Sequence, residues 1–335
     1  MSPTLSDIAG EVGVSIMTVS RALADRPGVA VDTKQRIMDV AKRLGYTVAP
    51  GNRTALRTAP TVGILVNNIG SEYINEIIDG ISNILDVASY DIVIYNPYRL
   101  RRTPDDYIFE VSQRPMDGML IAAANILQSI DYIEQVSQQR FPIVFIDQKV
   151  SGTSIPYVTA SNWQGAFDAM RYLEQLGHRR VGFVAGPLTE SPSSERLAGY
   201  RDALTQHNIP YDEQLVCYGD FTRQSGFLSG QSLLSMPQPP TAIFASNDPM
   251  AFGVMKAIQH AGKRIPEDIS VLGFDDIASS ADANPPLTTV RQPLREMGRV
   301  GAQILSDMIR GHVHLDNVEL RTSLILRDSC APLRS

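Results

Sequence analysis

The chain has 335 residues, of which 43% are hydrophobic and 20% are charged, and its formal net charge is −6. This length exceeds one ordinary core, because domains usually contain about 100–200 residues, so we expect two or three domains. No apolar run approaches the ~20 residues needed to cross a bilayer. The N-terminus has no basic segment followed by an apolar one, so no signal peptide is predicted. We therefore expect a cytoplasmic globular protein that does not enter a membrane.

The charges are divided unevenly along the chain. Residues 1–57 contain eight Lys or Arg against five acidic residues, a net of +3, and the remaining residues carry −9. This distribution is expected when only a basic head meets phosphate groups, because an acidic body discourages non-specific binding to nucleic acid. The alternative is an ordinary solvated surface, on which eight cations are unremarkable.

The sequence lacks the motifs of common catalytic and metal sites. It contains no GxGxxG, P-loop or HExxH sequence. Its two cysteines, Cys217 and Cys330, are far apart and show neither a disulfide framework nor metal-ligand spacing. Among the five histidines, His312 and His314 form a weak metal pair that is more typical of a solvated loop. We therefore expect no enzyme, no cofactor and no metal.

The first predicted elements are two short helices within residues 4–23. Thr4 and Asp7 have the spacing of a capping box, and Gly13 ends the first helix. Ser15 is placed to cap the second helix, because its hydroxyl can accept from a free backbone N–H. Apolar residues at helical spacing form two facing stripes: Leu5, Ile8, Ala9 and Val12, then Val19, Ala22 and Leu23. This pattern predicts a helix-turn-helix; the alternative is any small helical hairpin with Ile16 and Met17 in its core.

A third helix and a linker are predicted next. The helix runs from about residue 32 to 44, and its apolar stripe consists of Ile37, Val40, Ala41 and Leu44. Gly45 ends it. Residues 46–60 contain Pro50, Gly51 and Pro60 and are typical of a linker.

From Thr61 onward, short apolar runs alternate with helical segments, which favours buried parallel strands in doubly wound α/β units. Strands are predicted at 62–66, 92–95, 119–121, 143–146, 181–184, 215–217, 242–244, 270–273, 287–291 and 318–326. Helices are predicted at 72–87, 104–114, 126–139, 162–176, 194–207, 223–235, 249–262 and 294–310. Two such units bind ligands at the carboxyl ends of their strands, so candidate site residues should lie directly after strands.

Several phrases in this sequence resemble those of LacI/GalR-family transcription regulators, in family order over nearly the whole chain. They are Thr4–Ala9, Gly13–Ser15, Thr18–Leu23, Leu176–Gly182, Arg196–Tyr200, Ser246–Asp248, Gly273–Asp276 and Pro286–Val290. The resemblance implies an N-terminal all-α helix-turn-helix head and an α/β periplasmic-binding-protein-like (type I) core of two doubly wound subdomains.

The domain boundaries follow from the same reasoning. We expect a head at 1–46, a hinge linker at 47–60 and an effector-binding and dimerisation core at 61–335. Within the core, the N-subdomain is predicted at about 61–160 and 291–319, and the C-subdomain at about 161–290 and 320–335.

The resemblance implies that the second helix reads DNA. A guanidinium at Arg21 can take both acceptors of a guanine edge, worth ~1–3 kcal/mol of discrimination. Ile16 and Met17 cannot donate hydrogen bonds, so we expect contacts to thymine methyls; packing of Met17 in the head core is the alternative. In the family, the linker places a leucine in the minor groove, but this chain departs from the usual spacing, and Leu56 is either that wedge or part of a tether. The full candidate set is Thr4, Ser15, Ile16, Met17, Thr18, Ser20, Arg21, Asn52 and Leu56.

The resemblance also implies a small-molecule site in the core. Arg196 and Asp275 match positions that hold the ligand. A carboxylate that faces a guanidinium across a cleft can accept from one edge of a polyol while the guanidinium donates to the other edge. The alternative is a structural ion pair between the subdomains. Trp163 is as consistent with core or hinge packing as with the site. The full candidate set is Tyr73, Asp147, Trp163, Arg196, Phe221, Asn247, Asp275 and Gln292.

These observations predict a homodimeric DNA-binding repressor. It would bind a near-palindromic double-stranded operator, with an affinity controlled by a small molecule, a sugar in preference to a purine. The alternative is a solute-binding protein of the same core fold that delivers a sugar to a transporter. A third hypothesis is a sugar-processing enzyme with an accessory head, but the sequence shows no set of catalytic residues that supports it.

Overall fold

The computed structural model describes residues 4–23, 29–44, 59–96, 116–122, 141–150, 152–312 and 316–333. The chain divides into two compact units, Met1–Ala59 and Pro60–Ser335. The predicted helices at 104–114 and 126–139, and the linker residues Asn52 and Leu56, lie outside the described residues.

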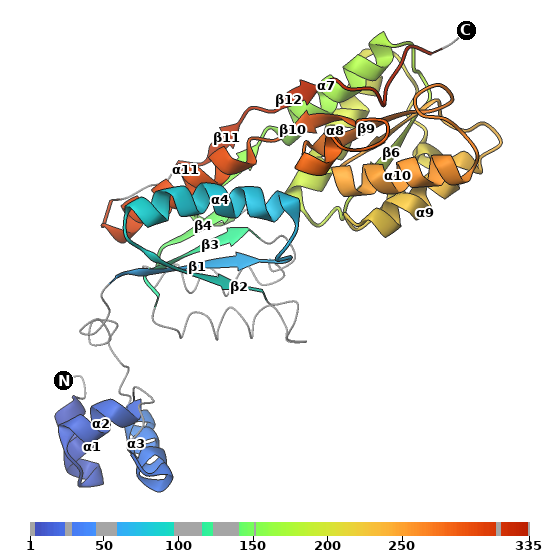
Figure 1. Cartoon of the computed structure of the whole chain (residues 1–335). Helices are drawn as coiled ribbons and strands as arrows, with labels where there is room; N and C mark the ends of the chain where they lie inside the picture. Colours follow the sequence, from blue (N-terminus) through green and yellow to red (C-terminus); the bar gives the residue numbers. More distant parts are fainter. Residues whose placement is uncertain are drawn as a thin grey trace. The chain divides into compact units, whose positions relative to one another are not determined.

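The described residues of the first unit form three helices, α1 (Leu5–Val12), α2 (Ile16–Leu23) and α3 (Val31–Arg43) (Figure 1). Their buried side chains form one small core: Ile8, Ala9, Val12, Val19, Ala22, Ile37 and Ala41. Leu5, Leu23, Val40 and Leu44 pack against it while partly exposed. The apolar stripes predicted from helical spacing are therefore confirmed as the faces on which the three helices meet.

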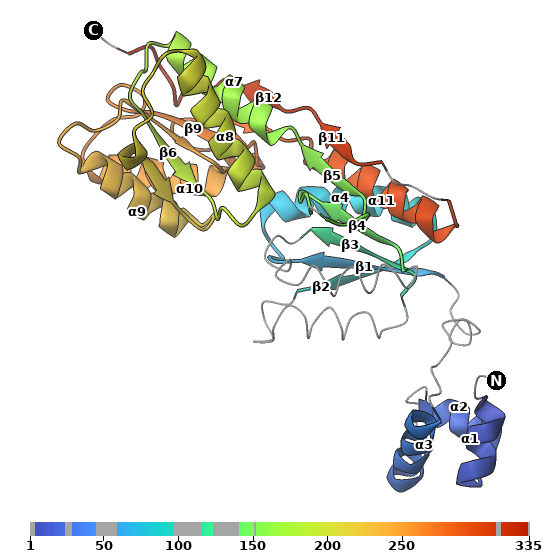
Figure 2. The ribbon, with the colours of Figure 1, turned by 180° about the vertical axis from the view of Figure 1, so that it is seen from behind.

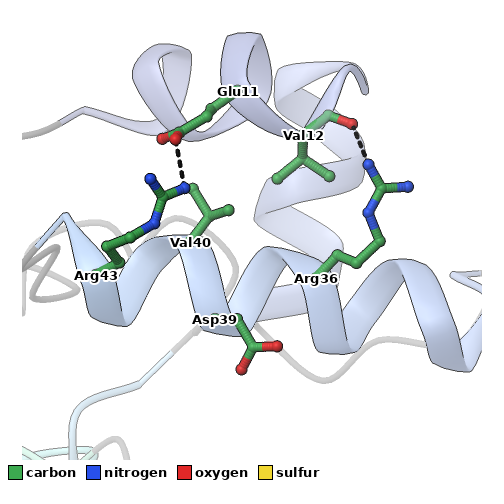
Figure 3. Close-up of a pocket in the computed structure, with 6 residues that line it drawn as sticks. All are labelled: Glu11, Val12, Arg36, Asp39, Val40 and Arg43. Atoms are coloured by element: carbon green, nitrogen blue, oxygen red, sulfur yellow. Dashed lines mark hydrogen bonds and ion pairs between the residues drawn. The ribbon is translucent and has the colours of Figure 1, made fainter.

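Two arginines of α3 hold that helix against α1. They line a shallow pocket together with Glu11, Val12, Asp39 and Val40 (Figure 3). Arg36 Nη2 donates to the Val12 carbonyl at 3.2 Å, and Arg43 pairs with Glu11. The Val12 carbonyl is one of the unpaired C=O groups at the end of α1, so Arg36 satisfies an acceptor that the helix itself leaves free.

The second unit contains two six-stranded sheets. The first has the order β11-β5-β4-β3-β1-β2 and parallel pairing throughout its described registers. Its strands are β1 (Thr61–Val66), β2 (Asp91–Tyr95), β3 (Gly118–Ala122), β4 (Ile143–Ile146), β5 (Tyr157–Ala160) and β11 (Val318–Leu320). Helices α4 (Glu72–Val87) and α11 (Leu294–Ile309) lie side by side over one face (Figure 1). We call these elements the N-lobe.

The contact between α4 and α11 depends on glycine. A Cβ added at Gly298 would lie 2.1 Å from the Ile77 carbonyl oxygen, and one at Gly80 would lie 2.0 Å from the Arg295 carbonyl oxygen. Real Cβ atoms do not approach backbone oxygens so closely, so any larger residue would force the two helices apart.

The second sheet has the order β12-β10-β9-β8-β6-β7, and only the pairing of β12 with β10 is antiparallel among its described registers. Its strands are β6 (Val181–Ala185), β7 (Val216–Tyr218), β8 (Ala242–Ala245), β9 (Ser270–Asp275), β10 (Thr288–Arg291) and β12 (Ser323–Ile325). Its helices are α7 (Asn162–Gln175), α8 (Ser191–Gln206), α9 (Arg223–Leu234) and α10 (Asp248–His260). We call these elements the C-lobe.

The two faces of this sheet are covered by different helix pairs (Figures 1 and 2). Successive residues of a strand point to opposite faces, and Phe183 packs with α7 and α8 whereas Val184 packs with α9 and α10. Both faces are thus buried, which explains why the strands are apolar runs without alternation.

Three details of the chain course differ from the sequence prediction. The strand β5 was not predicted. The single strand expected at 318–326 is wrong: it divides into β11 in one sheet and β12 in the other, with Arg321 and Thr322 between them. Helix α8 begins at Ser191, three residues early, with proline in its first turn, where the missing N–H costs nothing. None of the described helices is both long and apolar enough to cross a membrane.

Candidate functional site

Helix α2 presents its first turn to solvent. Ser15 caps the helix as predicted, since its Oγ accepts from the Thr18 backbone N–H at 3.1 Å and lies 2.8 Å from Thr18 Oγ1. Ile16 and Met17 are 51% and 66% exposed. Packing of Met17 in the head core, the alternative considered from sequence, is therefore wrong.

Arg21 is exposed and forms no hydrogen bond or ion pair with residues 4–23 or 29–44. Thr4 differs from it, because its hydroxyl is committed to a capping box. Thr4 Oγ1 donates to Asp7 Oδ2 at 2.7 Å, and the Asp7 N–H donates back to Thr4 Oγ1 at 3.3 Å. The bonds from the Thr4 hydroxyl and the Thr4 backbone N–H to the Asp7 carboxylate lower the pKa of that carboxyl. Thr4 is thus engaged within α1, whereas Arg21 is exposed on α2.

In the core, the guanidinium of Arg196 is the centre of a buried polar cluster. Arg196 is 2% exposed and lies on α8. Its Nε donates to Asn162 Oδ1 at 2.8 Å and its Nη1 to the Ser246 carbonyl at 2.6 Å. The Arg196 guanidinium also lies 3.9 Å from the centre of the Phe274 ring, a cation–π contact.

The carboxyl of Asp275 pairs with Arg196, and both residues belong to the C-lobe. The expectation that the pair faces across a cleft is therefore wrong, as is the alternative of a structural ion pair between the subdomains. Asp275 ends β9 with a φ of 123°, and its Oδ1 lies 3.7 Å from Arg196 Nη1. Gln292 Nε2 donates to the same oxygen at 2.8 Å. Burial raises the pKa of the Asp275 carboxyl well above its ordinary range, while the Arg196 guanidinium pulls it down.

The N-lobe contributes a second carboxyl, Asp147, directly after β4. The Tyr73 hydroxyl of α4 donates to Asp147 Oδ2. Burial raises the pKa of Asp147 to about 6, against the opposing pull of Arg196, and the pKa of Tyr73 is raised by burial and by the Asp147 charge. Asp147 follows β4 and Asp275 is the last residue of β9, so both lie at the carboxyl ends of strands, where the crevice rule places ligand contacts. We refer to Asp147, Asn162, Arg196, Ser246, Asp275 and Gln292 as the Arg196 cluster.

Two further candidates hold a loop of the C-lobe. Asn247 Oδ1 caps α10 by accepting from the Met250 N–H at 2.9 Å, and its Nδ2 donates to the Phe221 carbonyl at 3.1 Å. Phe221 has a φ of 66°, and its ring fills the space in which a Cβ at Gly186 would lie. Both the oxygen and the nitrogen of the Asn247 amide are thus engaged within the C-lobe, where they connect the start of α10 to the backbone of Phe221.

Trp163 stands apart from the Arg196 cluster. Its side chain is 38% exposed, and its Nε1 donates to Asp202 Oδ2 on α8 at 2.7 Å. Its ring stacks on Phe167 with 5.1 Å between centroids. The hydrogen bond to Asp202 joins α7 to α8. These contacts favour the packing role of Trp163 over a role in the ligand site.

Among the described residues, hydrogen bonds join the lobes beside Glu72 and beside Lys149, away from the points where the chain crosses between them. The Ser279 N–H donates to Glu72 Oε2 at 2.8 Å, and the Ser279 hydroxyl bonds to the same carboxylate. Elsewhere the Lys149 N–H donates to Ser191 Oγ at 2.9 Å, and Lys149 Nζ lies 2.8 Å from Glu195. Each bond connects an N-lobe residue to the beginning of α8 or to the loop after β9.

Sequence reasoning missed several polar residues at this joint. Asn162 and Ser246 contact Arg196 directly, and Ser193 and Glu190 lie one and two turns before it on or beside α8. The spacing of three residues between Ser193 and Arg196 was a usable signal, since such residues share a helix face. Asn162 and Ser246 had no such signal, because they belong to other elements.

Among the described residues, buried side-chain atoms without a hydrogen-bond partner concentrate here. They are Asp147 Oδ1, Ser193 Oγ, Ser246 Oγ and Gln292 Oε1, with His207 Nε2 as the one elsewhere. Buried polar atoms are rarely left unpaired, and each such atom costs ~1–3 kcal/mol. Four in one place therefore indicate a site for a polar ligand.

The chain resembles proteins of known function over almost its whole length. Residues 4–48 match the family described as bacterial regulatory proteins, lacI family, and residues 170–330 match the periplasmic binding protein-like domain. The HTH-type transcriptional repressor CytR of Escherichia coli strain K12 is 34% identical over 334 residues, which cover 98% of this chain and 97% of CytR.

Two solved structures are similar throughout. The complex of the transcriptional regulator CelR with cellobiose has a TM-score of 0.73 and 29% identity, covering 98% of this chain and 99% of CelR. The lac repressor dimer bound to operator and the anti-inducer ONPF has a TM-score of 0.73 and 26% identity, covering 99% of this chain and 100% of that chain.

A helix-turn-helix head followed by a core of two parallel-sheet lobes defines a DNA-binding transcription regulator with a periplasmic-binding-like core. The chain belongs to the LacI family of bacterial regulatory proteins. The solute-binding alternative is not favoured, because the head and the full-length similarity both point to regulators, and the relatives are regulators and not enzymes.

Proposed function

We propose that this protein is a cytoplasmic repressor whose operator affinity changes when a sugar binds at the Arg196 cluster. The observation that carries the proposal is the group of four buried, unpaired polar atoms around that cluster. Two of them, Asp147 Oδ1 and Gln292 Oε1, can only accept hydrogen bonds in their usual states, while the two serine hydroxyls can do either. A polyhydroxylated ring supplies donors and acceptors in this mixture, which supports a sugar.

The DNA half of the proposal rests on the exposed side chains of Ile16, Met17 and Arg21 on α2. Arg21 reads a guanine edge, Ile16 and Met17 contact thymine methyls, and Ser15, Thr18 and Ser20 position the helix on the backbone. The protein acts as a homodimer on a near-palindromic operator, because two heads related by a two-fold axis require two half-sites. Asn52 and Leu56 belong to the proposed linker contacts.

Gel-shift titration of the full chain against its upstream intergenic DNA tests the reading helix. We expect Arg21→Ala to lose ~1–3 kcal/mol of preference for operator over scrambled DNA while keeping a weak, salt-sensitive affinity. Arg264→Ala, an exposed arginine of the core, is the matched control and should bind as the parent does. Unchanged discrimination in Arg21→Ala would show that α2 is not the reading helix.

A thermal-shift screen over sugars and nucleobases tests the effector half. A ligand that binds only the folded protein stabilises it by ~2.7 kcal/mol at a hundredfold excess over its Kd. Asp275→Asn should abolish the shift caused by the best sugar, whereas Asp268→Asn, at an exposed ion pair, should retain it. A nucleobase that stabilises the protein when no sugar does would replace the sugar in this proposal.

A further inference from the structure

Glu190 is a buried carboxyl at the beginning of α8 that the helix does not use. It is 7% exposed and occupies the N-cap position, but its side chain forms no capping hydrogen bond. Its backbone carbonyl accepts from the Ser193 and Ser194 N–H groups, but no residue in the described ranges donates a hydrogen bond to its carboxyl group. An N-cap carboxylate normally accepts from the first turn, so this side chain is free to serve another purpose.

Glu190 belongs to the C-lobe but lies beside Asp147 of the N-lobe. The Lys149 N–H, two residues after Asp147, donates to Ser191 Oγ, one residue after Glu190, at 2.9 Å. The Asp147 carboxylate is also close enough to raise the pKa of Glu190, which burial brings to about 7. The carboxyls of Asp147 and Glu190 thus come from opposite lobes to the same region. In this region Asp147 Oδ1 and the fully buried Ser193 Oγ have no hydrogen-bond partner among the described residues.

The charges of this region are predominantly negative. Asp147, Glu190 and Asp275 supply three carboxyls, and Arg196 is the cation that interacts with all three. The other nearby cation, Lys149, has its ammonium 2.8 Å from each of the carboxylates of Glu195 and Glu319. Within the described part of the lobe joint, no unpaired cation is available for an anionic ligand.

We infer that Glu190, together with Asp147, makes the effector site selective by charge: it accepts a polyol that is uncharged or carries an amine, and it rejects sugars that carry a phosphate or a carboxylate. This inference rests on the proposed function, because it concerns the ligand of the same site. Uncharged hydroxyls and ammonium groups can donate to both carboxylates. An anionic group has no proton to donate there and would face like charges in a buried place, and this repulsion weakens its binding.

A ligand between Asp147 and Glu190 would also change how the two lobes interact. With both carboxyls ionised and no ligand present, Asp147 and Glu190 repel one another across the lobes. A donor-rich ligand between them replaces this repulsion with two charge-assisted hydrogen bonds, one to each lobe. The ligand is therefore held from both sides, and the lobes are drawn together.

The test is isothermal titration of the full chain with matched sugars: glucose, glucosamine, glucose 6-phosphate and glucuronate, then ribose and ribose 5-phosphate, then cellobiose. Measurements at about pH 8 keep both carboxyls ionised, since their pKa values are raised only to about 6 and about 7. We expect binding among the uncharged and amino sugars, and at least roughly tenfold weaker binding of each anionic counterpart, or ~1.4 kcal/mol.

Glu190→Gln keeps the size of the side chain and removes its charge. The ratio of Kd values between the anionic sugar and its uncharged parent should fall roughly tenfold in this variant. Glu213→Gln, at an exposed position of the same lobe, should leave the ratio unchanged. Melting curves of the ligand-free variants establish that each is folded before titration.

Each result decides between the two proposals. An anionic sugar that binds the parent protein as tightly as its uncharged form, or a ratio unaffected by Glu190→Gln, overturns the charge selection and leaves a sugar-responsive regulator in place. If no sugar binds and none changes operator affinity in a gel shift, the proposed function fails and the charge selection fails with it.

Discussion

Replacing Arg196 by methionine should destabilise the core far more than replacing an exposed arginine. Methionine fills a similar volume without the charge, so the change leaves Asn162 Oδ1 and the Ser246 carbonyl without their donor. Asp275 keeps the hydrogen bond from Gln292 but loses its cation. Removing one partner of a buried ion pair costs ~3–5 kcal/mol. Two charge-assisted hydrogen bonds at ~1.5–3 kcal/mol each give ~3–6 kcal/mol, which overlaps that range.

The expected change in melting temperature follows from the size of the unit Pro60–Ser335, which has 276 residues. An unfolding entropy of ~2.1 cal/mol/K per residue gives ~0.6 kcal/mol/K for this unit, so the Arg196→Met variant should melt ~5–9 °C lower. Calorimetry of the ligand-free protein measures this. Arg264→Met, in an exposed pair with Asp268, should change the stability by less than ~1 kcal/mol.

A double variant, Arg196→Met with Asp275→Asn, measures how much of the destabilisation comes from the Asp275 carboxylate that Arg196→Met leaves buried without its cation. Burial already holds the pKa of Asp275 well above its ordinary value, and the guanidinium that lowers it is gone in the single variant. In the single variant the folded state then binds more protons than the unfolded state, so its loss of stability relative to the parent should shrink as the pH falls through the raised pKa of Asp275. Asp275→Asn should recover part of this loss at every pH above that pKa. A single variant as stable as Arg264→Met, or a double variant no better than the single, would refute the assignment of a buried ion pair.

Three further changes test other parts of the structure. Glu72→Gln weakens the acceptor of the Ser279 N–H, so protection of that amide against hydrogen exchange should fall about fivefold, or ~1 kcal/mol; unchanged protection would mean that the bond does not hold the lobes. Gly298→Ala places a methyl group against the Ile77 carbonyl and should cost ~1–3 kcal/mol in thermal melting. Ser15→Ala removes the cap of α2 and should lower the head's stability by ~1 kcal/mol by circular dichroism, whereas Ser15→Asn keeps the cap.

The sequence predicted most elements because their signals are local. Helix α4 was expected at 72–87 and lies there, since its apolar residues recur at helical spacing and no proline interrupts it. The apolar runs 62–66 and 143–146 became β1 and β4 because strands buried on both faces have no polar alternation. What failed was the prediction of a single strand over residues 318–326. Residues 318–326 divide between the sheets because pairing partners, Val158 for Val318 and Thr289 for Ile325, are set by tertiary structure.

The site was predictable in part for the same reason. Its position at the end of a predicted strand marked Asp275, whereas Asp147 and Arg196 were pointed to by the family resemblance. Glu190 carried no such mark, because an acidic residue before a helix is ordinarily a cap. Two features single out Glu190 in the structure: its side chain forms no capping hydrogen bond, and the N-lobe residue Lys149 bonds to the neighbouring Ser191. Neither feature can be read from the local sequence.

The course of the chain restricts how a ligand at the lobe joint can affect the head. The residue after the head's unit, Pro60, precedes β1, and its carbonyl accepts from the Asp91 N–H at 2.8 Å, so the connection enters the N-lobe sheet directly. In that sheet β1 pairs with β3, and β3 pairs with β4, whose end carries Asp147. A ligand that binds Asp147 and Glu190 acts on both lobes, but only the N-lobe is covalently joined to the head. Coupling must then run through the N-lobe sheet or through a second subunit, and because coupling is reciprocal, bound operator must alter ligand affinity by the same factor.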